Sequence, residues 1–335
     1  MLVLGIETSC DDSCIALVDG TGKILANVVS SQVDIHRQFG GVVPEVASRK
    51  HLELLPFVLH SALSGAQITL DAIDLITVTR GPGLLGSLLM GMCFAKTLAL
   101  AKSKPLLGVN HLEGHLFAIR LDYPTLEPPF IALIVSGGHT ELVDVAEWGR
   151  YQVLGGTRDD AAGEAYDKVA KFLGLGYPGG AIIDRLSEQG NPQRFFFVGG
   201  LETEDTLDFS FSGLKTAVVR TFSRFSKEEK QNFQSIVDLV ASFQESVVRI
   251  LLKKTITALK ITGYRRVVLG GGVAANRYLR KKMKEGGEQR GFQVFFPSPS
   301  LCTDNAAMIA ICGLFHFLQG RRDSLHVEPD PHFSL

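Results

Sequence analysis

The feature that most constrains the fold of this chain is an order of elements that occurs twice. The apolar run at residues 2–6 is typical of a buried strand, a polar turn covers residues 7–12, and a second strand follows at 13–18. Later, Leu75-Ile76-Thr77-Val78-Thr79 is another buried strand, and Gly81-Pro82-Gly83 closes it and opens a helix. These elements together indicate one α/β unit.

The second half of the chain repeats this order. The strand at residues 130–135 ends in Ser136-Gly137-Gly138-His139-Thr140, and residues 141–145 return as its hairpin partner. The strand at 266–269 is closed by Gly270-Gly271-Gly272, which we expect to open a helix at Val273. The repetition predicts a duplicated α/β fold.

We place the two halves at residues 1–110 and 111–335, with a helical insertion at about 159–243 in the second half. A cleft between two such halves is where we expect the functional site.

Composition narrows the class of protein. Among 335 residues, 45% are hydrophobic and 21% are charged, which is typical of a globular chain of two domains. A net charge of −1 excludes a general attraction to nucleic acid, so any RNA contact needs a local patch or a partner. The five cysteines form no C-x-x-C pair and indicate a reducing compartment.

We expect a cytoplasmic protein without a membrane segment. The N-terminus has no basic region of the kind that begins a signal peptide. The most apolar helix, residues 84–101, contains Lys96, Gly86 and Gly91, and we expect it to fall short of a membrane span and to face the core or a partner.

The run His111-Leu112-Glu113-Gly114-His115 is the strongest candidate for a metal site. It follows a short strand at 105–109, and Asn110 is a good N-cap for a helix that starts there. Two histidines four residues apart share one helix face, roughly 5–6 Å apart at Cβ, which suits a transition metal. Gly114 suggests that another segment approaches the backbone closely. The alternative is two buried structural histidines, and a third ligand must come from elsewhere.

Three turns present small residues where backbone N–H groups bind anions: Thr8-Ser9-Cys10, residues 136–139 and residues 270–272. The run Gly81-Pro82-Gly83-Leu84-Leu85-Gly86 matches a dinucleotide-binding pattern, but no acidic residue follows near Leu106, and we reject that interpretation. A zinc protease is disfavoured because Glu113 lies two positions from each histidine and so faces away from both.

Seven motifs then stand in order along the chain: Gly5-Ile6-Glu7-Thr8-Ser9-Cys10-Asp11, Gly40-Gly41-Val42-Val43-Pro44-Glu45, His111 to His115, Val135 to Thr140, Asp160-Ala161-Ala162-Gly163-Glu164-Ala165, Phe209-Ser210-Phe211-Ser212-Gly213-Leu214-Lys215 and Cys302-Thr303-Asp304-Asn305. They resemble the TsaD family of bacterial tRNA threonylcarbamoyltransferases, and the resemblance extends from Leu2 to about His326. It implies an actin/Hsp70-like (ASKHA) two-domain fold, which agrees with the duplication.

The resemblance implies transfer of threonylcarbamoyl from threonylcarbamoyl-AMP to the exocyclic amine of the adenosine beside the tRNA anticodon. It implies a divalent metal, iron(II) or alternatively zinc, on His111, His115 and Asp304. From the sequence alone, Asp304 is also a strong candidate for the N-cap of the apolar helix that follows, and the two roles do not exclude each other.

The resemblance also implies a nucleotide site, for threonylcarbamoyl-AMP or ATP and ADP. The matching positions are Ile134, Val135, Ser136, Gly137, Gly138, Asp167, Gly180, Asp184 and Asn276. We assign Asp11 to orienting or deprotonating the attacking amine, with an Asx-type turn residue as the alternative. Departures are Asp12 in place of the usual Glu and Pro331-His332-Phe333 in place of Pro-Arg-Trp, which leaves any role of the tail open.

Partners are implied as well: tRNA, a TsaB-like homologue and a TsaE-like ATPase. The densest basic run, residues 277–290, is more simply a solvated helix face than an RNA contact. The main rival function is an ATPase or kinase of the same fold, which would use Mg²⁺ with carboxylates rather than paired histidines. A non-catalytic member of the fold would lack the metal ligands.

Overall fold

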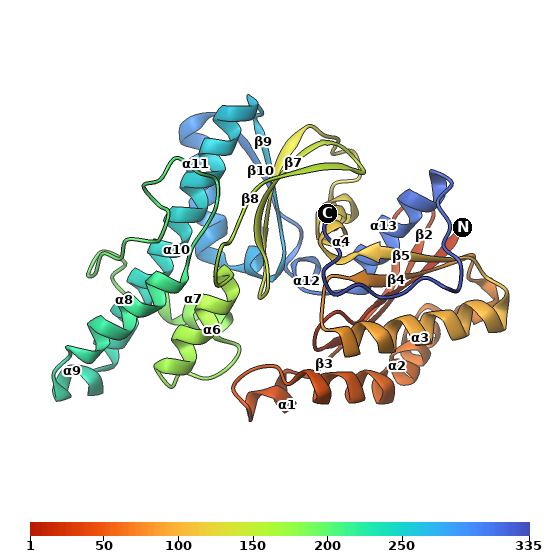
Figure 1. Cartoon of the computed structure of the whole chain (residues 1–335), viewed down its shortest axis with the longest axis horizontal. Coiled ribbons are helices and arrows are strands. Elements are labelled where there is room, and N and C mark those ends of the chain that lie inside the picture. Colours follow the sequence, from red (N-terminus) through yellow and green to blue (C-terminus); the bar gives the residue numbers. More distant parts are fainter. The chain divides into compact units, whose positions relative to one another are not determined.

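The computed structural model describes all 335 residues and divides them into two compact units (Figure 1). The first unit contains residues 1–126 and 297–335, and the second contains residues 127–296. Each unit is built on one five-stranded sheet.

The sheet of the first unit has the order β3-β2-β1-β4-β5. Its strands are β1 (Leu2–Glu7), β2 (Asp12–Asp19), β3 (Ile24–Ser31), β4 (Leu75–Gly81) and β5 (Leu106–Asn110). Strand β1 pairs antiparallel with β2 and parallel with β4, and β5 continues in parallel from β4. The predicted strand–turn–strand opening and the later buried strand therefore lie next to each other in one sheet.

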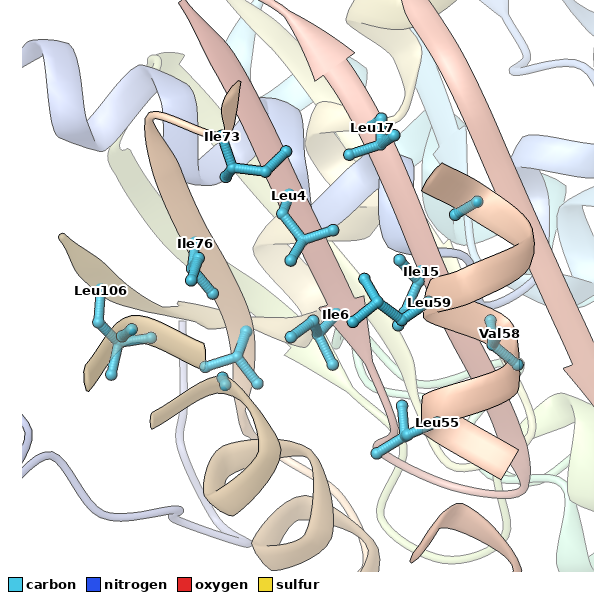
Figure 2. Close-up of a cluster of buried hydrophobic side chains, with 14 of the residues drawn as sticks. Leu4, Ile6, Ile15, Leu17, Leu55, Val58, Leu59, Ile73, Ile76 and Leu106 are labelled. Carbon is cyan, nitrogen blue, oxygen red and sulfur yellow. The ribbon is translucent and has the colours of Figure 1, made fainter. Parts of the chain in front are cut away.

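The helices of the first unit are α1 (Val33–Arg37), α2 (Pro44–Ala66), η1 (Leu70–Ala72), α3 (Leu85–Lys102), α4 (His111–Phe117), α5 (Ile119–Asp122), α12 (Pro299–Cys302) and α13 (Ala306–Leu318). Alternate residues of β1 face opposite sides of the sheet. Leu4 and Ile6 pack in a core cluster with Leu55 of α2 (Figure 2). Met92 of α3 belongs to the same cluster, so these two helices cover one face.

Helix α13 covers the other face of the first sheet. A Cβ on Gly5 would lie 2.2 Å from the carbonyl oxygen of Ala306, so only glycine lets the start of α13 lie against β1. Because α13 packs on β1 and β2, residues from the end of the chain belong to the first unit. The predicted division after residue 110 thus differs from the division into compact units, which leaves α4 and α13 together.

The second unit repeats the topology of the first. Its sheet has the order β10-β9-β6-β7-β8, with strands β6 (Phe130–Val135), β7 (Thr140–Glu147), β8 (Arg150–Gly156), β9 (Arg266–Gly270) and β10 (Gln293–Phe295). Strand β6 is antiparallel to β7 and parallel to β9, as β1 is to β2 and β4. The shared order and directions confirm the duplicated α/β fold.

The helices of the second unit are α6 (Ala162–Phe172), α7 (Gly179–Ser187), α8 (Ser212–Ser223), α9 (Lys227–Gln231), α10 (Phe233–Thr262), η2 (Gly272–Ala275) and α11 (Arg277–Arg290). Five of them stand between β8 and β9, where the first unit has α1, α2 and η1. The long helix α10 runs to Thr262, beyond the predicted end of the insertion near residue 243.

Two further expectations are corrected. The glycines after β9 open the short 3-10 helix η2 rather than a long helix at Val273, and α11 starts only after the N-cap Asn276. Helix α3 was predicted to fall short of a membrane span, but its length and apolar composition are sufficient for one. In the structure α3 packs on α2 and β4 through one face, which buries Leu88, Met92 and Ala95.

Candidate functional site

The first unit places His111 and His115 one turn apart at the start of α4. The side-chain oxygen of Asn110 accepts hydrogen bonds from the backbone N–H groups of Leu112 (2.8 Å) and Glu113 (3.1 Å), which confirms the predicted N-cap. The two imidazole rings are buried, with centroids 4.7 Å apart. The helix start therefore presents both rings to the same point.

Asp304, directly before the cap of α13, supplies the third group. Its Oδ1 lies 3.6 Å from Nε2 of His111 and 3.3 Å from Nε2 of His115, and the potential ligand atoms of the three residues all lie within 4.8 Å of one another. The N-cap of α13 is Asn305, whose side chain accepts from the N–H of Met308. The alternative that Asp304 caps this helix is therefore wrong, and its carboxylate faces the two histidines.

Close packing of α13 on α4 brings Asp304 to this position. A Cβ on Gly114 would lie 2.8 Å from Cδ1 of Ile309 and 3.3 Å from Cγ of Met308. The expectation that Gly114 permits a close approach is confirmed, and the segment that approaches is α13.

Glu7 is a site residue that the sequence analysis missed. It lies buried at the end of β1, and its Oε2 is 2.9 Å from Nδ1 of His111. Its carboxylate also accepts hydrogen bonds from Thr79 Oγ1 and the N–H of Ser9, while Ser9 Oγ lies 3.2 Å from His111 Nδ1. A buried acidic residue that ends an apolar strand was the available signal. A carboxylate behind an imidazole fixes the orientation of the ring and leaves Nε2 facing the other ligands.

The charges of this cluster are strongly coupled. Burial alone would lower the pKa of His111, but the negative charges of Glu7 and Asp304 outweigh it and raise this pKa to about 9. Burial would likewise raise the pKa of Glu7, yet the neighbouring His111 lowers it. Two carboxylates around one imidazole thus attract a positive charge to this point, which a proton or a metal cation can supply.

His115 provides the test of whether these residues fit a metal. Its ring is completely buried, Nδ1 has no hydrogen-bond partner, and Nε2 has only the Asp304 carboxylate, whose Oδ1 lies 3.3 Å away. A buried polar atom without a partner costs about 1–3 kcal/mol. Burial also lowers the pKa of His115, which favours the neutral imidazole that a metal requires. Imidazole nitrogens and a carboxylate are ligands of iron and zinc, so the residues fit the implied metal.

Asp11 lies in the turn between β1 and β2, in the same unit as the histidines. The thiol of Cys10 is hydrogen-bonded to the side chain of Asp11. The pKa of this thiol is raised by burial first and then by the charges of Asp11 and Asp304. Both carboxylates therefore act on one thiol. The turn at residues 8–10 is held against the start of α3, because Thr8 Oγ1 donates to Ser87 O and Ser87 Oγ donates to Cys10 O. Of the predicted anion-binding turns, this one borders His111, through the contact of Ser9 Oγ with His111 Nδ1.

In the second unit, the other two glycine-rich turns lie together at the carboxyl ends of β6 and β9. A Cβ on Gly271 would lie 2.4 Å from the carbonyl oxygen of Val135, and a Cβ on Gly163 would lie 2.5 Å from that of Ser136. The Ser136 hydroxyl accepts from the N–H of His139 and holds the turn closed. Ile134 and Val135 are buried strand residues below it.

Gly137 and Gly138 form the exposed tip of this turn. A Cβ added at either position would meet nothing within 4 Å. The tip therefore has room for a bound group beside its backbone N–H groups.

The remaining predicted contacts join the helices of the second unit. Asp167 accepts from the N–H of Gly179 (2.7 Å), at the start of α7, where a Cβ on Gly180 would meet open space. Asp184 accepts from the N–H and Nε of Arg277, both at 3.1 Å, and lines a cavity of about 310 Å³.

Asn276, the N-cap of α11, accepts from the N–H of Leu279 and donates to Gln244 Oε1 at 2.8 Å. Asp184 and Asn276 thus meet at one helix start, which the spacing of these residues in the sequence did not reveal.

Several members of the basic run on α11 have partners within the unit. Arg277 pairs with Asp184 and Glu188, and Lys282 pairs with Glu285. These pairs favour the interpretation of the run as a structural and solvated face.

Comparison with known proteins identifies the family. The family profile described as "TsaD: tRNA N6-adenosine threonylcarbamoyltransferase" matches residues 23–311. A protein named tRNA N6-adenosine threonylcarbamoyltransferase from Thermosipho africanus is 52% identical over 335 residues, with 100% of both chains covered. One of the same name from Clostridium perfringens is 48% identical over 334 residues, covering 100% of this chain and 98% of the other.

Solved structures agree on the fold alone, since their sequence identities are low. HypF from T. kodakarensis superposes with a TM-score of 0.62 at 14% identity, over 95% of this chain and 48% of that one. An activator of 2-hydroxyisocaproyl-CoA dehydratase from Clostridium difficile gives 0.56 at 14% identity, over 96% and 97%. The ROK hexokinase from Thermus thermophilus gives 0.51 at 18% identity, over 96% and 100%. The predicted ASKHA fold is confirmed.

These findings favour the transferase over the two rival functions, a zinc protease and an ATPase or kinase of the same fold. Glu113 is bonded to His316 on α13 rather than directed at the paired histidines, as the protease argument expected. The two sequence relatives that match the whole chain at about 50% identity are both named tRNA N6-adenosine threonylcarbamoyltransferase, whereas the hexokinase shares only 18% identity and shows the fold alone. The chain belongs to the TsaD family of tRNA N6-adenosine threonylcarbamoyltransferases.

Proposed function

We propose that this transferase takes threonylcarbamoyl-AMP as donor, modifies the exocyclic amine of the adenosine beside the tRNA anticodon, and binds its metal through His111, His115 and Asp304. The observation that carries the proposal is the convergence of these three groups, with the buried Nε2 of His115 3.3 Å from Asp304 Oδ1 and its Nδ1 without a partner.

Iron(II) is the metal we propose, with zinc as the alternative. When bound, it supplies a Lewis acid that polarises an oxygen of the substrate. Three protein ligands leave coordination positions for that oxygen. Glu7 holds the His111 ring in place through Nδ1, so the ligand set is oriented before the metal arrives.

The reaction itself needs mainly orientation, because an adenylate is already a good leaving group. The amine nitrogen of the adenosine attacks the carbamoyl carbon, the bond from that carbon to the phosphate oxygen breaks, and AMP leaves with the bonding electrons. The amine loses a proton, which we assign to the carboxylate of Asp11. Its position next to Cys10, on which Asp304 also acts, supports this role.

The glycine-rich turn at the end of β6 is the proposed phosphate site. The open space at Gly137 and Gly138 leaves backbone N–H groups free to approach the phosphate, with Ile134, Val135 and Ser136 as the rigid base of the turn. We assign Asp167, Gly180 and Asp184 to the ribose and threonyl-adenylate, and Asn276 to the base. The cavity beside Asp184 supports the assignment.

The substrate tRNA and two protein partners complete the proposal. Helices α2 and α3 expose large apolar side chains, among them Leu52 (67% exposed), Phe57 (72%) and Leu100 (69%). Such a surface is typical of a protein interface, and we propose a TsaB-like homologue there. A TsaE-like ATPase is the second partner, and the cytoplasm, where tRNA is found, is the compartment.

A single-turnover assay tests the function. Labelled threonylcarbamoyl-AMP and unmodified tRNA are mixed with the native protein, His111→Ala or His115→Ala, with partners present and metal content measured. We expect transfer and metal to disappear together in both variants, and His326→Ala, an exposed histidine, to behave as the native protein does. Undiminished transfer by a metal-free variant would make the histidines structural, and ATP turnover without transfer would favour the ATPase.

A further inference from the structure

A second cluster of metal-binding side chains lies on the opposite side of α4. Glu113 stands between the two histidines in sequence, but its carboxylate meets Cys312 and His316 of α13 instead. Both Oε1 and Oε2 of Glu113 lie 2.9 Å from His316 Nε2. The potential ligand atoms of the three residues lie within 4.8 Å of one another.

The ligand types and their spacing suit zinc. Cys312 and His316 are four residues apart on α13 and therefore share one helix face, as His111 and His115 do on α4. A thiolate, an imidazole and a carboxylate are all zinc ligands, and three of them leave one position for water. The site is enclosed, since Cys312 is fully buried and the side chains of Glu113 and His316 are only 7% and 14% exposed.

The three side chains of the cluster converge on one buried point. The His316 ring donates a hydrogen bond to the Glu113 carboxylate, and the Cys312 thiol is hydrogen-bonded to the same carboxylate. Two donated protons thus converge on one buried anion. A divalent cation that replaced them would be held by one thiolate and one carboxylate, so that the buried group as a whole is neutral.

A Glu113–His316 pair by itself would not need a thiol directed at the same carboxylate. The convergence of all three groups from two helices is what distinguishes a binding site from an ion pair.

We propose that Glu113, Cys312 and His316 bind one Zn²⁺ ion, at a site separate from the one formed by His111, His115 and Asp304. The ion ties α4 to α13 at the turn that carries the paired histidines. On binding, the thiol proton passes to solvent, the imidazole binds in its neutral form, and no electron is transferred.

Cobalt substitution gives a test that depends on the thiolate. The whole chain is stripped of metal with a chelator and titrated with Co²⁺, which produces a thiolate-to-cobalt charge-transfer band in the near ultraviolet only where a cysteine is a ligand. To remove the first site, the titration is repeated on the His111→Ala/His115→Ala double variant. We expect one Co²⁺ per chain in the double variant, with the band at full intensity.

Three further substitutions, each made in the His111→Ala/His115→Ala double variant, show which residues produce the charge-transfer band. Cys312→Ala and His316→Gln should abolish it and reduce bound cobalt at least tenfold, and each variant is checked for native circular dichroism. Cys93→Ser, which changes the exposed thiol on α3, should leave both unchanged. If Cys312→Ala does not fold, His316→Gln decides.

The absence of a charge-transfer band, or a band that survives Cys312→Ala, overturns the proposal. Either result leaves the first site untouched, because that site has no cysteine ligand. Conversely, if the double variant keeps the cobalt charge-transfer band and loses threonylcarbamoyl transfer, that result shows that the two sites are distinct.

Discussion

Nδ1 of His111 lies 2.9 Å from Oε2 of Glu7, a residue 104 positions earlier in the chain. The first strand thus ends in a carboxylate that orients a histidine at the start of α4. Because Thr79 and Ser9 also donate to that carboxylate, the glutamate cannot turn away without breaking several buried hydrogen bonds. The orientation of the ligand is therefore built into the first sheet.

Replacing this carboxylate should weaken metal binding without removing a ligand. In Glu7→Gln the neutral amide no longer complements the imidazole, and loss of such an outer partner typically lowers metal affinity about 10–100-fold. Competition with a chelator measures the affinity, and Glu53→Gln on the exposed face of α2 is the control. Native affinity in Glu7→Gln would show that the contact has no part in metal binding.

Asn110 connects the helix of the paired histidines to the C-terminal tail. Its Oδ1 caps α4, and its Nδ2 donates to the carbonyl oxygens of Phe333 (2.8 Å) and Ser334 (3.1 Å). Asn110→Ala loses both functions and should lower the free energy of unfolding by about 1–3 kcal/mol. Asn110→Ser keeps a capping oxygen and should cost about 1 kcal/mol less. Urea denaturation compares them, and equal losses would mean that the cap contributes nothing.

The repeated order of elements allowed the sequence to predict the duplicated fold, since the local pattern of each unit agrees with its sheet. The His111–His115 pair and its cap were also predictable, because helix geometry relates residues only four positions apart. The edge strand β8 was missed, since several of its side chains are exposed and its pattern is not that of a buried strand.

Contacts between distant segments could not be predicted from local pattern. Asp304 and Asn305 are both good caps, and only the packing of α13 on β1 and α4 decides which residue caps and which faces the histidines. The same packing moves α13 into the first unit, and it depends on the absence of a side chain at Gly5 and Gly114.

Gly114→Ala tests this packing. Alanine is the better helix former by about 1 kcal/mol, but the new methyl group would lie 2.8 Å from Cδ1 of Ile309. We expect a net loss of stability of about 1–3 kcal/mol from overpacking. Ile309→Val removes the opposing methyl group, so the double variant should be more stable than the sum of the single changes predicts. Additive effects in urea denaturation would contradict the close approach, and Gly65→Ala, where nothing lies within 4 Å, is the control.

Gly137→Ala separates ligand binding from folding at the proposed phosphate turn. An added Cβ meets nothing within 4 Å in the protein, so the melting temperature should not change. If a phosphate lies against this backbone, the methyl group occupies its place, and AMP should bind about tenfold more weakly, a loss of about 1.4 kcal/mol. Calorimetric titration with AMP measures the affinity, and Gly213→Ala, equally open, is the matched control. Unchanged affinity in Gly137→Ala would place the phosphate elsewhere.

Asp159, at the start of the helical insertion, should make stability depend on pH. Although partial burial would raise its pKa, hydrogen bonds from Ser210, Ser212 and the N–H of Phe211 outweigh this and lower the pKa below its ordinary value. A lowered pKa in the folded state stabilises the protein above the unfolded pKa of about 3.9, and this contribution is lost as the pH falls through the folded value. Asp159→Asn should therefore lower the free energy of unfolding by its full amount at neutral pH. The difference in this free energy between the variant and the native protein should shrink as the pH falls below about 4. Urea denaturation at neutral pH and below about pH 4 measures this difference. A difference that is the same under both conditions would mean that the charge of Asp159 does not contribute to stability.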